Sequence, residues 1–247
     1  MKTTENTVLI TGGSAGIGLE IARLFSAQGN KVIITGRNQN LLDEALSQLP
    51  NATAIVGDIS KSEDVENLVT IIKKDYPQLN VVVNNAGYAA LHNLLDDSDS
   101  FGIAQQEMLT NYLSTIRLNQ AFLPLLSEKE DAAIINVSSV AAIVPGATGT
   151  PTYSASKAAL HSYTLSLRTR LSQTKSKVKV FELMPPLVNT RFSAEIGGEN
   201  GMPPLEVAQA LIDGLKNDNF EIHVGQTQYV YDLYLKSPEE ALNVMNQ

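Results

Sequence analysis

The fold class of this chain follows from one segment near its start, Thr7-Val-Leu-Ile-Thr-Gly-Gly-Ser-Ala-Gly-Ile-Gly18. Residues 7–11 predict a short buried strand, the glycines predict a sharp turn, and residues 19–27 have the pattern of an amphipathic helix. Glycines let the backbone approach a pyrophosphate, whose charge meets the N–H groups and positive end of the helix. The segment therefore predicts a nucleotide phosphate site, although ordinary loops are also rich in glycine.

The rest of the chain repeats this alternation of strand and helix. Further strands are predicted at 31–35, 52–56, 81–83, 133–137, 178–184 and 221–224, and further helices at 40–49, 62–76, 104–126, 151–174, 205–216 and 229–235, with a last helix starting near Ser237. The alternation predicts an α/β fold with one Rossmann-type, doubly wound, mostly parallel sheet of about seven strands and helices on both faces. With 247 residues and 43% hydrophobic content, residues 1–247 are expected to form a single domain.

Composition argues against several classes of partner. A net charge of -8 without a Lys/Arg cluster argues against nucleic acid and anionic membranes, and the absence of cysteine excludes disulfides and thiolate metal sites. The three histidines, at 92, 161 and 223, have no ligand spacing, so no metal site is expected. The longest apolar tract, residues 132–147, contains polar residues and is too short to cross a membrane. A polar start, residues 1–7, predicts a cytoplasmic protein without a signal peptide.

Two side chains in the second half have the spacing of a proton donor and its cationic neighbour. Tyr153 and Lys157 are four residues apart in a predicted helix, so they lie on one face, although such pairs also occur by chance. A cation beside the phenol is expected to lower its pKa from about 10 toward the operating pH, which suits an acid catalyst. Ser138 and Ser139 follow a predicted strand and would face the crevice at the end of the sheet, unless they only form a turn.

Taken together, the motifs resemble the short-chain dehydrogenase/reductase family. These are Thr11-Gly-x-x-x-Gly-x-Gly18, Asn84-Asn-Ala-Gly87, Ser139 and Tyr153-x-x-x-Lys157, and their order and spacing match the family over residues 7–190. The resemblance implies an enzyme that passes hydride between a nicotinamide and a carbonyl or alcohol carbon, with Tyr153 as the acid/base. It also implies that Ser139 orients the substrate oxygen, that Ser138 is structural, that Lys157 binds ribose and steadies the phenolate, and that Asn111 holds a water linking Lys157 to solvent.

The same resemblance implies a set of cofactor-binding residues: Gly12, Ser14, Gly16, Ile17, Gly18, Arg37, Asp58, Ile59, Asn85, Ala86, Gly87, Tyr153, Lys157, Pro185, Val188 and Thr190. Asp58 is expected to contact the adenine, unless it only starts the next helix. Arg37 lies about where an NAD site presents an acid to the ribose, and an arginine there favours NADP(H). The glycine turn adds no second basic residue, so NAD(H) stays possible, and Arg37 alone is also typical of a solvated surface.

The run Pro185-Pro-Leu-Val-Asn-Thr190 departs from the family, which usually has Pro-Gly at its start. Pro186 fixes φ and removes an N–H. Val188 and Thr190 keep the register of the family pattern, and the resemblance implies that they lie beside the nicotinamide carboxamide. This run and the chain length resemble bacterial oxidoreductases encoded beside lipoteichoic-acid D-alanylation genes. Residues 187–204 are expected to form a substrate lid, with a plain surface loop as the alternative.

Residues 140–152 and 187–202 are mainly apolar, so the expected substrate is a small or medium uncharged carbonyl or alcohol, although Arg191 is suited to a carboxylate. The resemblance implies a homodimer or homotetramer assembled through the helices at 104–126 and 151–174. A non-catalytic cofactor-binding regulator is the alternative function, but such a protein would usually lack the serine, tyrosine or lysine. A nucleotide-sugar epimerase or dehydratase would need a longer segment after residue 190.

Overall fold

The computed structural model describes residues 1–96, 98–146 and 149–246. Within these residues the strands form one seven-stranded sheet in the order β3-β2-β1-β4-β5-β6-β7, and every neighbouring pair is parallel. The strands are β1 (Thr7–Thr11), β2 (Lys31–Gly36), β3 (Ala52–Val56), β4 (Val81–Asn84), β5 (Ala132–Val137), β6 (Val178–Met184) and β7 (Glu221–His223). The strand order reverses between β1 and β4, which is the arrangement of a doubly wound fold. The predicted fold class is confirmed.

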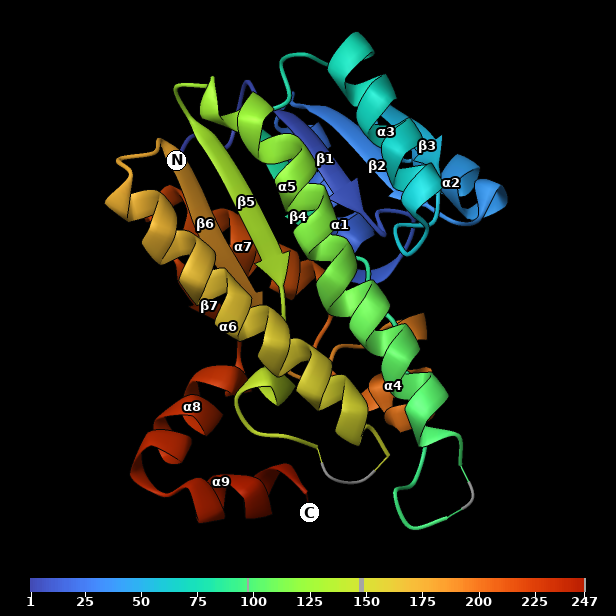
Figure 1. The fold of residues 1–247 in the computed structure, drawn as a ribbon, viewed down its shortest axis with the longest axis vertical. Coiled ribbons are helices and arrows are strands. Elements are labelled where there is room, and N and C mark those ends of the chain that lie inside the picture. The colour runs from blue at the N-terminus through green and yellow to red at the C-terminus, as the bar shows by residue number, and fades with distance from the viewer. Residues whose placement is uncertain (97, 147–148, 247) are drawn as a thin grey trace.

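Helices cover both faces of the sheet (Figure 1). One face packs against α1 (Gly16–Ala27), α2 (Gln39–Leu46) and α7 (Pro204–Lys216), and the other against α3 (Ser62–Asp75), α5 (Ser114–Ser127) and α6 (Pro151–Gln173). In β1, Val8 and Ile10 join the first cluster while Leu9 joins the second. Because helices cover both faces of the sheet, the central strands are continuous apolar runs and do not alternate between apolar and polar residues.

The helix predicted at 104–126 differs from the observed one. It begins earlier, as α4 (Ser100–Met108), passes through a π-helical segment (η1, Leu109–Leu113), and continues as α5. Asp99 starts it by accepting a hydrogen bond from the Gly102 N–H. A π turn adds one residue to the helical repeat, which apolar periodicity does not reveal. Its consequence is local, because Asn111 lies within the π segment.

The C-terminal helices α8 (Gln226–Lys236) and α9 (Pro238–Met245) pack at the carboxyl end of the sheet, below it in Figure 1. Val230 and Ala241 contact Val140 and Val144 in the segment after β5. These two helices therefore close one end of the region where the strands terminate. Among the described residues, every helix falls short of the length and apolar character that crossing a membrane requires.

The predicted lid, residues 187–204, has regular structure. It contains the 3-10 helices η3 (Arg191–Ile196) and η4 (Gly198–Asn200). Its two ends are joined, since the Asn189 N–H donates to the Met202 carbonyl at 2.8 Å and the Met202 N–H donates to the Leu187 carbonyl at 2.9 Å. That the segment opens and closes stays a prediction.

Candidate active site

A cavity of about 580 Å³ lies along the carboxyl ends of the strands. Every strand from β1 to β6 is followed by residues that line it, which is where doubly wound folds bind ligands. Of the predicted site residues, the cavity brings together Gly12, Ser14, Gly16, Ile17, Arg37, Asp58, Ile59, Asn85, Ala86, Gly87, Ser139, Tyr153, Lys157, Pro185, Val188 and Thr190. Gly18 and Asn111 do not line the cavity, but both contact residues that do.

The glycine turn after β1 leaves room for a ligand backbone to approach. The helix α1 begins at Gly16, not at residue 19 as predicted, so it emerges directly from the turn. Its N-cap residue, Ala15, makes no side-chain capping bond, which leaves the first N–H groups of α1 for an anion. Gly12 and Gly16 both have positive φ, a conformation that other residues rarely adopt. These features fit the phosphates of a dinucleotide.

Two buried hydroxyls in the cavity add to this fit. Thr35 Oγ1 and Ser138 Oγ are buried and have no hydrogen-bond partner among the described residues. Both residues line the cavity. Because an unpaired buried polar group costs free energy, these two atoms are suited to bind polar groups of a ligand.

Gly18 is required for the turn itself. A Cβ at this position would lie 2.4 Å from the Gly12 carbonyl oxygen and 2.5 Å from Asn85 Nδ2. Gly18→Ala is therefore expected to destabilise the fold by about 1–3 kcal/mol and to weaken NADPH binding roughly tenfold or more. Thermal unfolding and NADPH titration measure both effects. For the melting temperature, Gly57→Ala is the matched control, because its Cβ meets Asp64 Cβ at an ordinary 3.6 Å. Equal melting temperatures for the two variants would contradict this role.

Asn85 ties the end of β4 to the end of β1. Its side-chain Nδ2 donates to the Thr11 carbonyl at 2.9 Å and to the Gly12 carbonyl at 3.3 Å. In return, Thr11 Oγ1 accepts the backbone N–H groups of Asn85 and Ala86, each at 3.0 Å. The Asn84–Gly87 motif therefore holds the glycine turn in shape, in addition to lining the cavity.

The residues predicted to select the adenine half lie at the ends of β2 and β3. Arg37 is exposed at the cavity edge, next to a more open hollow lined by Arg37, Asn38, Gln39 and Asn40. Asp58 uses Oδ1 to accept from both the N–H (2.9 Å) and the hydroxyl (2.7 Å) of Ser60. Asp58 thus shapes the turn before α3 and also lines the cavity. That it contacts the adenine stays a prediction.

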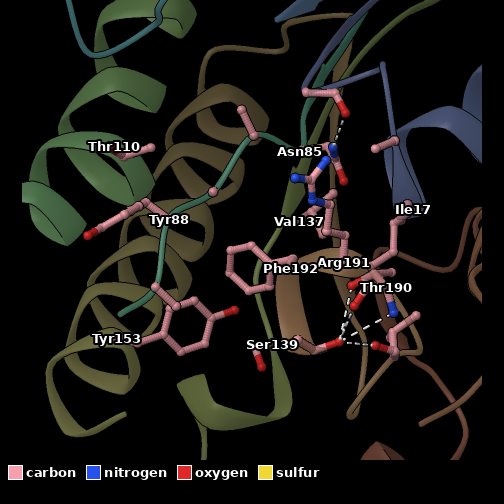
Figure 2. Close-up of a pocket in the computed structure, with 18 of the residues that line it drawn as sticks. Ile17, Asn85, Tyr88, Thr110, Val137, Ser139, Tyr153, Thr190, Arg191 and Phe192 are labelled. Carbon is pink, nitrogen blue, oxygen red and sulfur yellow. Dashed lines mark hydrogen bonds between the residues drawn. The ribbon is translucent and has the colours of Figure 1, made fainter. Parts of the chain in front are cut away.

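Tyr153, Ser139 and Lys157 meet at the other end of the cavity. Figure 2 shows the Tyr153 ring extending into the cavity with Ser139 beside it. Lys157 is buried; its Nζ donates to the Val137 carbonyl at 2.9 Å and lies 5.7 Å from the centre of the Tyr153 ring. The predicted one-face arrangement of Tyr153 and Lys157 on α6 is therefore observed.

The predicted direction of the Tyr153 pKa shift is wrong for this structure. Burial raises the pKa of Tyr153 to about 12, against an opposing hydrogen bond from Ser139, and the charge of Glu107 raises it further. Burial also lowers the pKa of Lys157 to about 8, although the nearby Glu182 carboxylate acts the other way. Desolvation therefore outweighs the attraction between cation and phenolate that the spacing predicts.

Asn111 is buried and reaches the site through its neighbours. Its amide accepts from the Tyr88 N–H and donates to the Tyr88 carbonyl, both at 2.8 Å, and also donates to Ser156 Oγ at 2.8 Å. A Cβ on Gly87 would lie 3.4 Å from Asn111 Oδ1 and 3.8 Å from Lys157 Nζ. Both side chains thus border the same small space beside Gly87. That Asn111 holds a water there stays a prediction.

The segment after β6 forms the wall opposite the glycine turn. A Cβ on Gly16 would lie 3.1 Å from Thr190 Cγ2, so Thr190 packs against the turn. Pro186 lines the cavity with Pro185, whose carbonyl accepts the Val140 N–H at 3.0 Å. In Figure 2 the Arg191 side chain extends into the cavity toward Asn85, and Phe192 lies beside Tyr153 with ring centres 6.0 Å apart.

Sequence reasoning missed part of the lining. Residues 88–91 line the cavity and could have been predicted, because they directly follow the Asn84–Gly87 motif. Met245 also lines it, but it lies near the C-terminus and no sequence motif indicated this. His161 lies outside the lining; its Nδ1 pairs with the buried Glu182 carboxylate at 2.9 Å, which raises the pKa of His161. Within the described residues, no cluster of histidines and acids suited to a metal ion is found.

Comparisons with known proteins agree with this geometry. Residues 6–201 match the short chain dehydrogenase family. The chain is 40% identical over 227 residues to the uncharacterized oxidoreductase DltE of Bacillus subtilis, covering 90% of this chain and 89% of that protein. It is 29% identical to an uncharacterized oxidoreductase of Staphylococcus epidermidis, covering 87% and 92%.

Two solved structures share the fold. A short chain dehydrogenase/reductase from Burkholderia phymatum in complex with NAD has a TM-score of 0.88 at 19% identity, covering 100% of this chain and 97% of that one. A short chain dehydrogenase from Burkholderia cenocepacia in complex with NADP has a TM-score of 0.87 at 23% identity, covering 100% of both. The chain belongs to the short-chain dehydrogenase family of NAD(P)-dependent oxidoreductases.

Proposed function

We propose that this protein is an NADP(H)-dependent oxidoreductase that interconverts a carbonyl compound and its alcohol, with Tyr153 as the acid/base. The observation that carries the proposal is one continuous cavity. It has a glycine turn suited to phosphate at one end and Ser139, Tyr153 and Lys157 together at the other. The Bacillus relative and the family match support the same reaction class.

When bound, the nicotinamide supplies hydride to a carbonyl carbon or accepts it from an alcohol. Ser139 and Tyr153 hold the substrate oxygen between two hydroxyls, and in reduction the Tyr153 proton moves to that oxygen as it becomes negative. Lys157, fixed on the Val137 carbonyl, steadies the resulting phenolate by its charge. Gly12, Gly16 and the start of α1 would hold the phosphates, and Val188 and Thr190 the carboxamide side of the nicotinamide.

The substrate end of the cavity is mainly apolar. Leu91, Val140, Leu187, Phe192 and Ile196 are among its lining residues, whereas the Arg191 side chain extends toward Asn85, near the glycine turn (Figure 2). The proposed substrate is therefore a small or medium uncharged carbonyl compound. Residues 187–204 are proposed as its lid, and a homodimer or homotetramer as the assembly.

The test is NADPH oxidation by the purified protein against a panel of ketones and aldehydes with and without a carboxylate. Turnover of at least one class is expected. NADPH binding without turnover of any panel member would favour the regulator alternative, and absence of NADPH and NADH binding would overturn the proposal itself. Sedimentation of the same sample measures the assembly.

Arg37 is the proposed determinant of NADP over NAD. Arg37→Gln is expected to lower the ratio of kcat/KM for NADPH to kcat/KM for NADH by roughly tenfold or more, because a charge-assisted bond to the 2′-phosphate is lost. Steady-state kinetics with both cofactors measure the ratio. Arg23→Gln is the control, since Arg23 lies outside the cavity on α1 and pairs with Glu20. A ratio that stays the same in Arg37→Gln would argue against the assignment.

A further inference from the structure

The cavity wall formed by residues 88–91 is held from behind by two side chains of the α4–η1 helix. Asn111 binds both the N–H and the carbonyl of Tyr88. One turn earlier, the fully buried Glu107 accepts the Ala90 N–H on Oε1 at 3.2 Å. The wall segment is therefore fixed at two alternate residues by two side chains that are four residues apart.

Both side chains continue to α6. Asn111 donates to Ser156 Oγ at 2.8 Å, and Glu107 Oε2 accepts from the Thr152 hydroxyl at 2.5 Å. Thr152 and Ser156 are also four residues apart, and each directly precedes one of the catalytic pair, Tyr153 and Lys157. Two parallel links thus connect the cavity wall to α6, one behind each catalytic side chain. The Glu107 link holds the first turn of α6, whose N-cap residue Thr150 makes no side-chain capping bond.

His92 completes the Glu107 link. Its Nδ1 lies 3.1 Å from the Ala90 carbonyl, which only accepts, and its Nε2 lies 3.3 Å from Thr152 Oγ1. Thr152 has one hydroxyl proton to donate. Glu107 Oε2, Thr152 Oγ1 and His92 Nε2 therefore form one continuous run of contacts, which the His92 ring extends to the Ala90 carbonyl.

We propose that Glu107, Thr152 and His92 are positioning residues that hold Tyr153 in place relative to the cavity wall at residues 88–91. None of the three lines the cavity, so they act through their neighbours. Glu107 is close enough that its charge influences the pKa of Tyr153. The inference rests on the proposed reductase function. Because the cofactor phosphates would bind at the far end of the cavity, the cluster governs substrate turnover and not cofactor affinity.

The first test is a matched pair at Thr152. Thr152→Val keeps the shape but removes the hydroxyl, and Thr152→Ser keeps the hydroxyl. In Thr152→Val, kcat/KM for the carbonyl substrate is expected to fall roughly tenfold or more, while the NADPH dissociation constant stays within about twofold. Thr152→Ser is expected to stay near the wild type. A merely structural role would lower cofactor affinity together with activity, and unchanged kcat/KM in Thr152→Val would overturn the proposal.

The second test is a matched pair at Glu107. In Glu107→Gln the amide can accept the Ala90 N–H and donate to Thr152, which then donates to neutral His92, so all links are kept. This variant is expected to retain kcat/KM within about threefold. Glu107→Leu removes both links and is expected to lose roughly tenfold or more. Equal activities in the two variants would contradict the positioning role.

Hydrogen exchange of the segment 86–92 gives a readout without substrate. Faster exchange is expected in Glu107→Leu than in the wild type, with Glu107→Gln close to the wild type, because Ala90 N–H loses its acceptor. If the wild type reduces no carbonyl compound, the proposed function fails. The exchange rates still show whether Glu107 and Thr152 hold the wall segment in place. If Glu107→Leu does not fold, the Thr152 pair decides it by the same exchange measurement and by kinetics.

Discussion

Tyr153→Phe is expected to lower turnover by roughly 10²–10⁴-fold, the range that a general acid contributes. Phenylalanine keeps the ring, which lies 6.0 Å from the Phe192 ring, and removes only the hydroxyl that faces Ser139. Since the phosphate-binding end of the cavity is unchanged, the dissociation constant for NADPH is expected to stay within about twofold. Steady-state kinetics and NADPH fluorescence titration measure the two quantities separately.

The matched control is Tyr163→Phe on the same helix. The Tyr163 hydroxyl accepts from Asn119 Nδ2 at 3.4 Å and lies outside the cavity, so this change removes an equivalent atom without touching the reacting region. Wild-type turnover is expected for Tyr163→Phe. Comparable turnover in Tyr153→Phe and in the wild type would remove Tyr153 from the mechanism.

Most of the fold could be predicted because its signals are local. The apolar runs at β1, β2 and β4 and the glycine turn before α1 specify buried parallel strands and a phosphate-binding connection within a few residues. The π segment at Leu109–Leu113 could not be predicted, because it depends on bonds such as Ser114 Oγ to the Leu109 carbonyl and adds a residue without changing the apolar pattern. The start of α4 at Ser100 was missed because Asp96, Ser98 and Asp99 read as a polar loop.

The site divides in the same way. Ser139, Tyr153 and Lys157 were predicted from order and spacing, and the structure brings them together. Glu107, His92 and Met245 were not, because their relation to the site arises from contacts between segments far apart in the chain. The pKa direction of Tyr153 was missed for another reason. Spacing indicates which charge is near, but desolvation depends on how much of the fold surrounds the group.

Burial of the Lys157 ammonium also lowers the stability of the folded state. A pKa lowered from 10.5 to about 8 means that burying the cation disfavours the folded state by about 3 kcal/mol at neutral pH. The cost is fully present below about pH 8, where the folded and unfolded states both carry the proton. It disappears as pH rises from about 8 to the unfolded value of 10.5, because the unfolded state then binds more protons than the folded one.

Lys157→Met is therefore expected to separate activity from stability. Turnover should fall by roughly 10²-fold or more, because the charge that steadies the Tyr153 phenolate is lost. The melting temperature near neutral pH should equal or exceed that of the wild type, since the relief of about 3 kcal/mol outweighs or balances the unpaired Val137 carbonyl, which costs about 1–3 kcal/mol.

The pH dependence identifies the cause. The difference in melting temperature between Lys157→Met and the wild type should shrink or reverse between about pH 7 and about pH 10, as the wild type gains stability from losing the buried proton. Lys74→Met, at an exposed position of α3, should show no such trend. A melting temperature for Lys157→Met well below that of the wild type at neutral pH would mean that Lys157 stabilises the fold. The site would then not hold a cation at the expense of stability.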